Sequence, residues 1–448
     1  MSPAGLTQSL GAFVSGLRHG DVPAAAWATV RAGFTDCVAT MIAGRAEPVV
    51  QMLKRTLGSS GEEATLYFSG ERTGAMDAAW INGTAAHALD YDDVALRGHP
   101  STTIVPALLA DGEALKSSGR ELAVAYVAGY EVWADLVDRD RGKHHDKGWH
   151  PTGIFGPLAA AAACARLRGL DAQQTASALG IAASRASGLM ANFGSMTKPF
   201  HAGCAAHAGV VAARLAAQGM TSSPDVLEHA QGFLNAVSPA GDYDATPRRA
   251  DAPWQIVRQG LSIKKYPICF AAHRVVDAAL DLAQRQEIRA AEVEHVTVSL
   301  SVLAAKLLRN ALPQTALEAK FSVQFAVAAS LLAGNVGLRE LTDEYVRSDA
   351  VQRLMQRVGV VTNDNYDAEA PVQSVHDELE IELVSGARHR SEQVHRPRGH
   401  PSVPLRAGEL WAKFEDCVAA GGGGRDAARL FEALQHIDGV SSVTALYG

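Results

Sequence analysis

The sequence has few cysteines, few aromatic residues and no long apolar run. Its 448 residues include five cysteines, which are scattered without a C-x-x-C pair or a zinc-type spacing. An odd number of separated cysteines favours reduced thiols in a cytoplasmic protein over a disulfide framework or an iron–sulfur site. The longest apolar runs, such as "GPLAAAAACA", are too short and too rich in alanine to span a bilayer. The first twenty residues lack a basic segment before a long apolar core, so we expect no signal peptide.

Positive charge is also scarce. The chain has 41 Lys and Arg residues against 48 Asp and Glu residues, which gives a formal net charge of −7. No stripe of Lys and Arg interleaved with aromatic residues is present, so we expect no nucleic-acid partner. Because 47% of the residues are hydrophobic, the chain has ample material for globular cores, and its length predicts two domains.

Helical periodicity built on Ala and Gly dominates the first half of the chain. One segment, 21–44, has Asp21 as a plausible N-cap and ends at Gly44. After about residue 254 the pattern changes, and 292–301 and 376–386 alternate polar and apolar residues as half-buried strands do. The tail after 404 is helical again and cannot bury its apolar face alone. We therefore predict a mainly α fold, with a large helical domain (1–258 and 404–448) and a smaller α+β domain (259–403).

Titratable residues concentrate in "HALDYDDVALRGHPS", residues 87–101. His87 and Asp90 are three residues apart, which predicts that they share one face of a helix. Crowded carboxylates raise one another's pKa, which suits a general base, and His99 in an irregular loop titrates near neutrality. A solvated acidic loop or a helix cap explains the same residues equally well. A magnesium site would need a second acidic cluster on a facing helix, which we do not find in the helical part.

A second cluster, "KHHDKGWHPTGIFGP", spans residues 143–157. We expect His144 and His145 to be exposed. His150, between Trp149 and a proline, is expected to hold a fixed, partly buried position before a helix that begins near Thr152. The free N–H groups of that helix could hold a substrate carboxylate, although an ordinary loop histidine is as good an explanation.

Two further stretches contain basic residues. In "MTKPFHAG" Lys198 precedes Pro199, which is expected to open a helix, so the lysine is placed to bind a carboxylate. In "KKYPICFAAH" Lys264 comes shortly before Cys269. A surface lysine and a strand–turn–helix are the ordinary explanations of these two stretches.

Taken together and in order, six motifs resemble the MmgE/PrpD family: "HALDYDD…GHPS", "GWHPTGIFGP", "MTKPFHAG", "KKYPIC…H", "EAKFSVQFAVA" and "RGHP". That family includes 2-methylcitrate dehydratase, cis-aconitate decarboxylase and iminodisuccinate epimerase. The resemblance implies a helical domain formed by both chain ends, a smaller α+β lid and a homodimer. It also implies a site in the cleft between the domains, with neither a metal nor an organic cofactor.

The resemblance also implies the roles of individual residues. Asp90 or His150 would handle the proton next to a carboxylate, and His99 would protonate a departing hydroxyl or receive the proton back. The substrate would be held by Lys198, as a point charge on a carboxylate, and by Lys264 and Cys269, which would close the site from the lid.

Three residues depart from the family pattern. Val94 stands where a Thr is expected, and Phe325 stands where many members have Tyr. Cys269 occupies a position at which the decarboxylase branch is expected to have His. Loss of a hydroxyl changes which polar substrate groups can be bound, and this argues against cis-aconitate decarboxylation. We expect a cofactor-independent carbon–oxygen lyase, a hydro-lyase that dehydrates a di- or tricarboxylate of the 2-methylcitrate type. The alternatives are an epimerase or isomerase of a polycarboxylate such as iminodisuccinate, and a non-catalytic carboxylate-binding relative.

Overall fold

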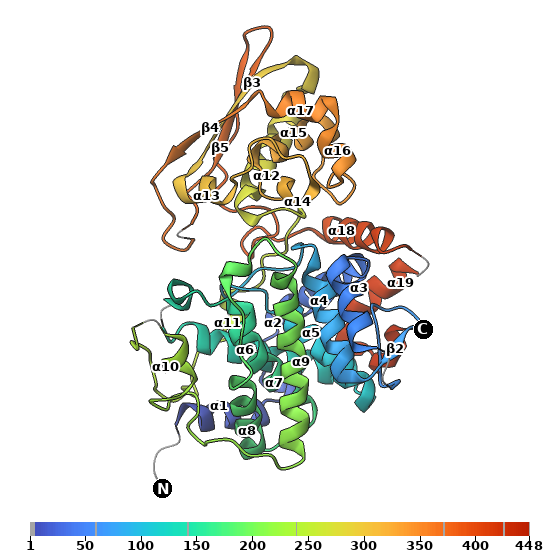
Figure 1. Ribbon diagram of the computed structural model, residues 1–448, viewed down its shortest axis with the longest axis vertical. Helices are drawn as coiled ribbons and strands as arrows, with labels where there is room; N and C mark the ends of the chain where they lie inside the picture. Colours follow the sequence, from blue (N-terminus) through green and yellow to red (C-terminus); the bar gives the residue numbers. More distant parts are fainter. Residues whose placement is uncertain are drawn as a thin grey trace. The chain divides into compact units, whose positions relative to one another are not determined.

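The computed structural model describes residues 5–58, 61–140, 143–238, 240–370, 372–423 and 426–447. The chain divides into two compact units, Met1–Ile263 with Leu410–Gly448 and Lys264–Glu409 (Figure 1). The sequence placed these boundaries at 258/259 and 403/404. Helices predominate and strands are few, so the predicted mainly α class with a smaller α+β portion is confirmed. Within the described ranges, no helix is long and apolar enough to cross a membrane.

The first unit is helical. Its longer helices are α1 (Leu6–Gly16), α2 (Ala26–Gly44), α3 (Pro48–Leu57), α4 (Ala75–Ala88), α5 (Ser101–Leu115), α6 (Gly119–Val137), α7 (Pro151–Leu167), α8 (Ala172–Ala183) and α9 (Thr197–Ala217). Two short helices follow, α10 (Phe233–Val237) and α11 (Gln255–Arg258), and β1 (Ala64–Thr65) pairs with β2 (Arg72–Thr73). The sequence predicted the end of α2 at Gly44 correctly but its start too early.

Small side chains let the central helices of this unit approach closely. α9 packs against both α7 and α4. A Cβ added at Gly209 of α9 would lie 2.3 Å from the Cβ of Ala160 in α7, and one at Gly203 would lie 2.3 Å from the carbonyl oxygen of Trp80 in α4. Larger residues at these two glycines would push the helices apart, because helix separation follows side-chain size. The Ala- and Gly-rich stripes of the sequence are therefore core contacts that bring the ends of α4, α7 and α9 near one another.

Two helices near the C-terminal end of the sequence, α18 (Ala407–Ala420) and α19 (Ala427–Gln435), carry residues of the first unit. α19 lies beside the N-terminal helices in Figure 1 and contacts α2, where the Gln435 side-chain amide donates a hydrogen bond of 2.7 Å to Thr35 Oγ1. Lys413 of α18 pairs with Asp36 of α2, with Nζ 2.5 Å from Oδ1. Both ends of the chain therefore contribute to the core of the first unit.

The second unit is built on a sheet with the strand order β4-β3-β5-β6. The central strand, β3 (Val293–Ser301), runs parallel to β4 (Val358–Asn363) and antiparallel to β5 (Glu378–Leu383), which pairs with β6 (Arg388–Arg390). β3 and β5 confirm the two alternating segments seen in the sequence. Val296, Val298 and Leu300 point into a core that also contains residues of the helices. The helices are α12 (His273–Arg285), α13 (Val302–Leu307), α14 (Ala316–Ala319), α15 (Val323–Ala333), α16 (Asp343–Arg347) and α17 (Asp349–Met355).

Candidate active site

Four helix ends of the first unit supply the polar side chains of the candidate site. His87 lies in the last turn of α4, His99 two residues before α5, His150 at the N-cap of α7, and Lys198 in the first turn of α9. α5 contacts α4, α7 and α9, so these ends belong to one packed group. The partial positive charges at the N-termini of α5, α7 and α9 favour an anionic ligand near them.

Asp90 lies just beyond the end of α4. The helix ends at Ala88, and Asp90 takes a left-handed backbone conformation with φ 54°, which Asp tolerates better than most residues. The prediction that Asp90 shares a helical face with His87 is therefore wrong, because the chain leaves the helix before Asp90. Instead Asp90 accepts a 2.7 Å hydrogen bond from the ammonium of Lys198, more than a hundred residues later in the chain. The two side chains stay 21% and 16% exposed, so a ligand can reach this ion pair.

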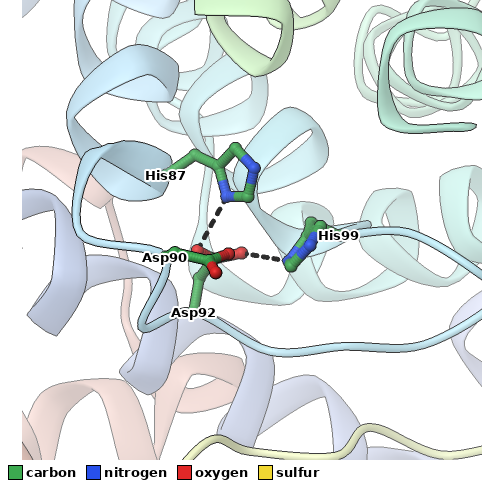
Figure 2. Close-up of side chains that lie close together, drawn as sticks. All are labelled: His87, Asp90, Asp92 and His99. Atoms are coloured by element: carbon green, nitrogen blue, oxygen red, sulfur yellow. Dashed lines mark hydrogen bonds and ion pairs between the residues drawn. The ribbon is translucent and has the colours of Figure 1, made fainter. Parts of the chain in front are cut away.

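Asp92 is the most enclosed acidic group of the site. Its carboxylate is fully buried and lies 2.8 Å from Nδ1 of His87 and 2.7 Å from Nδ1 of His99 (Figure 2). Burial by itself raises the pKa of Asp92, but the adjoining His87 and His99 hold that pKa well below its usual range. Burial lowers the pKa of His87 to about 4. Asp92 is therefore ionised and His87 neutral at neutral pH.

Carboxylates also crowd around Asp93, beneath the site. Burial, followed by the charges of Asp36 and Asp92, raises the pKa of Asp93 well above its usual value. Burial likewise raises the pKa of Asp36, although Lys413 opposes this effect. The sequence predicted that Asp90, Asp92 and Asp93 raise one another's pKa; the effect of Asp92 on Asp93 agrees with this, and the role of Asp90 as a base stays a prediction.

His150 has the buried position predicted for it and is 2% exposed. Its Nδ1 lies 3.0 Å from Nδ1 of His201, so one of these two nitrogens carries a hydrogen and the other accepts it. Burial, reinforced by the neighbouring His87 and Lys198, lowers the pKa of His150. The ring of Phe193 packs edge-on against His150 at 4.9 Å between centroids. His150 is therefore neutral at neutral pH, and the same surroundings make its imidazole a weak base.

Several functional candidates were missed in the sequence. Asp92 lies between Asp90 and Asp93 in the sequence, and only the fold shows which of the three carboxylates the histidines contact. His201 had a usable signal, because it follows Lys198 by three residues on a helix and so shares its face. His144, expected to be exposed, is buried against the ring of Phe155, and this prediction was wrong.

Lys264 and Cys269 belong to the second unit, of which Lys264 is the first residue. The N–H of Cys269 donates a 2.8 Å hydrogen bond to the carbonyl of Lys320. Phe325 is fully buried in α15, whereas Val94 of the first unit pairs through its backbone with Ser262. The roles of Lys264 and Cys269 in substrate binding stay predictions.

One group with metal-ligand atoms occurs in the described part of the chain. His87, Asp90, Asp92 and His99 each offer a ligand atom, and these atoms all lie within 4.8 Å of one another. The Asp92 oxygens, however, already face two imidazole nitrogens, and the ammonium of Lys198 contacts Asp90. A cation would have to displace these contacts and approach a lysine, so the arrangement suits an anionic organic ligand better.

Comparisons with known proteins agree with the motifs. Residues 8–246 match the MmgE/PrpD N-terminal domain, and residues 266–438 match the MmgE/PrpD C-terminal domain. The chain is 30% identical over 357 residues to cis-aconitate decarboxylase of Mus musculus, which covers 75% of this chain and 70% of the relative. It is 30% identical to the Homo sapiens enzyme of the same name over 351 residues, covering 75% and 71%. It is also 28% identical over 398 residues to the cis-aconitate decarboxylase-like protein oryM of Aspergillus oryzae, covering 81% and 80%. The chain belongs to the MmgE/PrpD family.

Proposed function

We propose that this protein is a lyase that removes a proton from the carbon next to a carboxylate of a di- or tricarboxylic acid. The observation that carries the proposal is the accessible ion pair of Lys198 with Asp90 in the same site as His99 and His150. A C–H bond next to a carboxylate is weakly acidic. The site must therefore offset the negative charge and hold a base close to the carbon. The curated relatives named cis-aconitate decarboxylase support a tricarboxylate as the kind of substrate.

A substrate carboxylate binds in the positively charged part of the site, at Lys198 and the N-termini of three helices. Lys198 contacts one substrate carboxylate while it keeps its hydrogen bond to Asp90, and the N-termini of α5, α7 and α9 favour the negative charge. Two carboxylates then share one ammonium. Each of them has a higher proton affinity than in an isolated ion pair, because like charges close together disfavour ionisation. Substrate binding therefore strengthens Asp90 as a proton acceptor.

Dehydration is the reaction that we propose first, on a hydroxylated substrate of the 2-methylcitrate type. Asp90 or His150 takes the proton from carbon, and the C–H electron pair forms the double bond. The C–O bond to the neighbouring carbon breaks, and the departing hydroxyl takes a proton that His99 has first taken up at Nε2, and leaves as water. No cofactor is needed, because the same electron pair that leaves the C–H bond expels the hydroxyl.

Decarboxylation of an unsaturated tricarboxylate is the second candidate, and the names of the relatives favour it. In that reaction a C–C bond breaks, carbon dioxide leaves, and the carbon takes up a proton. The residues that handle protons are the same in both reactions, and only the leaving group differs.

A substrate panel in deuterium oxide tests the proposal. Di- and tricarboxylates are incubated with the protein and followed by nuclear magnetic resonance, with released carbon dioxide measured in parallel. We expect deuterium at a carbon next to a carboxylate, together with an alkene for dehydration or carbon dioxide for decarboxylation. Exchange without either product would indicate an epimerase. The proposal fails if no member of the panel exchanges, or if Lys198→Met retains the full rate. The matched control is Lys306→Met, at an exposed lysine of α13.

A further inference from the structure

We propose that Asp92 is a positioning residue. Its buried carboxylate accepts the Nδ1–H of His87 and lies against Nδ1 of His99, whose hydrogen is donated to the carbonyl of Asp93, so that Nε2 of His99 is left to exchange protons with the substrate. The inference rests on the proposed function, because it assigns one atom of the site to the proton transfer. It adds a residue that does not itself contact the substrate.

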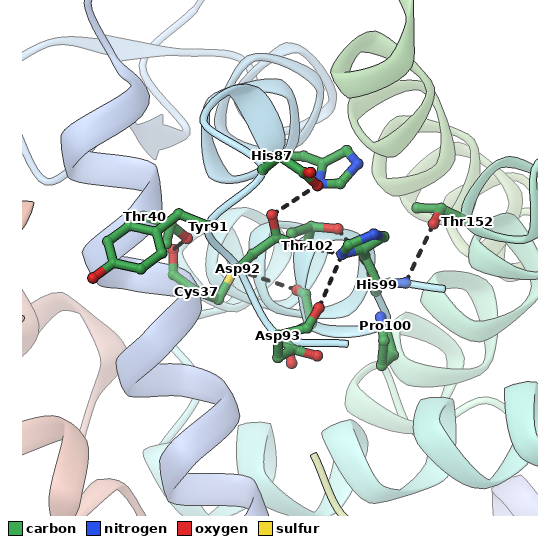
Figure 3. Close-up of polar contacts among 12 residues, drawn as sticks. Cys37, Thr40, His87, Tyr91, Asp92, Asp93, His99, Pro100, Thr102 and Thr152 are labelled. Atoms are coloured by element: carbon green, nitrogen blue, oxygen red, sulfur yellow. Dashed lines mark hydrogen bonds and ion pairs between the residues drawn. The ribbon is translucent and has the colours of Figure 1, made fainter. Parts of the chain in front are cut away.

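The tautomer of His99 follows from what its Nδ1 faces. This nitrogen lies 2.7 Å from the Asp92 carboxylate and 2.9 Å from the backbone carbonyl oxygen of Asp93 (Figure 3). A carbonyl oxygen only accepts hydrogen bonds, and so does an ionised carboxylate. Nδ1 of His99 must therefore carry the hydrogen, and in the neutral ring Nε2 carries the lone pair.

The rest of the loop holds the ring of His99 in place. The backbone N–H of His99 donates to Thr152 Oγ1 at 3.2 Å, and its carbonyl accepts from Thr102 Oγ1 at 2.8 Å. The side chain of His99 is 11% exposed, whereas that of Asp92 is fully buried. Asp92 thus lies behind the histidine and is screened from the ligand.

His87 completes the arrangement on the other oxygen of Asp92. Its Nδ1 lies 2.8 Å from Asp92 Oδ1, and its ring centroid is 4.3 Å from that of His99. Nε2 of His87 is buried without a hydrogen-bond partner among the described residues. A bare lone pair there costs less than a buried N–H without an acceptor would, so this environment also favours the Nδ1–H form.

The charge of Asp92 lies between the two imidazole rings, with one oxygen near each Nδ1 atom. Other charged and titratable groups around Asp92 and His99 are His87, Asp90, Asp93, His150 and Lys198. None of these groups lies against both Nδ1 atoms, as the Asp92 carboxylate does.

Histidine tautomers test the inference without any substrate. In protein labelled with 15N-histidine, long-range 1H–15N spectra distinguish a protonated ring nitrogen from a bare one. The signals of His87 and His99 are assigned from the variants His87→Gln and His99→Gln. We expect the Nδ1–H form of both rings in the unchanged protein near neutral pH. A hydrogen on Nε2 of His99 with Nδ1 bare would overturn the proposal, and the tautomers themselves are read in the unchanged protein.

Asp92→Asn is the decisive variant. The variant replaces one carboxylate oxygen by an NH2 group, which only donates, so one Nδ1–H group would face a donor. Because the carbonyl of Asp93 continues to accept from Nδ1 of His99, we expect the ring of His87 to change tautomer and the ring of His99 to be held less firmly. On the carboxylate that the panel identifies, we expect kcat to fall about 10²–10⁴-fold with KM changed much less, as for loss of a group that orients a catalytic histidine.

Asp111→Asn is the matched control. Asp111 is also fully buried and ion-paired, but with Arg168 and Arg214 rather than with a histidine. We expect it to lower the melting temperature and to leave both tautomers unchanged. The proposal fails if Asp92→Asn keeps both Nδ1–H forms, or if its kcat falls no further than that of the control. If the panel finds no substrate but the tautomers behave as expected, the proposed function fails and the assignment of Asp92 as the group that sets the tautomers stands.

Discussion

Replacing Lys413 by methionine tests the buried charges beneath the site. Nζ of Lys413 lies 2.5 Å from Asp36 Oδ1, donates a 2.7 Å hydrogen bond to the carbonyl of Tyr91, and sits 4.0 Å from the centre of the Tyr91 ring. The side chains of Lys413 and Asp36 are 3% and 0% exposed. Methionine fills a similar volume without charge, so the main effect of Lys413→Met is to leave Asp36 without its counter-ion.

The expected loss in the free energy of unfolding follows from two independent arguments. Removing one partner of a buried ion pair costs about 3–5 kcal/mol. Alternatively, Asp36 stays protonated in the folded variant. Keeping a carboxyl with an unfolded-state pKa of about 3.9 protonated at pH 7 costs up to about 4 kcal/mol, at about 1.4 kcal/mol per pH unit. The two values agree, so we expect a loss of about 3–4 kcal/mol at pH 7.

The pH dependence of this loss has a definite sign. Burial raises the pKa of Asp36 even with Lys413 present, and without Lys413 nothing on α18 opposes that rise. The folded variant therefore binds more protons than the unfolded chain, and its stability falls as pH rises above about 3.9. The deficit relative to the unchanged protein should be smaller at pH 5 than at pH 8.

Urea unfolding at pH 5 and pH 8 measures this deficit, with a fluorescence or circular-dichroism signal assigned to the first unit because two units need not unfold together. The double variant Lys413→Met/Asp36→Asn is the control and should recover more than half of the loss at pH 8. A loss below about 1 kcal/mol, or one that does not change with pH, would refute the reasoning.

Three further outcomes are expected. Asp93→Asn should flatten the dependence of the melting temperature on pH and be relatively more stable at pH 8 than at pH 5. The reason is that burial and the charges of Asp36 and Asp92 raise the pKa of Asp93, so its contribution to stability is lost as pH rises; an unchanged slope would argue against this. Lys198→Met should weaken calorimetric binding of the active carboxylate at least tenfold, and unchanged affinity would remove Lys198 as the anchor. Dialysis against a chelator should leave activity intact, whereas loss that magnesium restores would favour a metal at Asp90 and Asp92.

Local sequence patterns were enough to predict many of the helices and two of the strands. The alternation in 292–301 identified β3 because one face of this strand is buried, and the proline and glycine signals located the ends of long helices. β4 was not predicted, because "VGVVTN" is short and its partners lie some sixty residues away in the chain. Strand pairing of that kind depends on the fold as a whole and leaves little trace in a short window of sequence.

The sequence identified several residues of the site but not the contacts that each of them makes. Motifs identified His150 and Lys198, and the structure places both at helix ends of the first unit. The different contacts of Asp90, Asp92 and Asp93 could not be predicted from the sequence, because they depend on a left-handed turn after α4. That turn sends one carboxylate to Lys198, the next to the histidines and the last into the core. Consecutive acidic residues look alike in sequence and differ only through what the fold packs against them.

The central claim is that Lys198, Asp90, His99 and His150 act together on one carboxylate substrate. A crystal structure of the protein with the di- or tricarboxylate selected by the panel tests it most directly. We expect one substrate carboxylate at hydrogen-bond distance from Nζ of Lys198, with the acidic carbon facing Asp90, His99 or His150. A ligand bound elsewhere, with the Lys198–Asp90 pair untouched, would contradict the account.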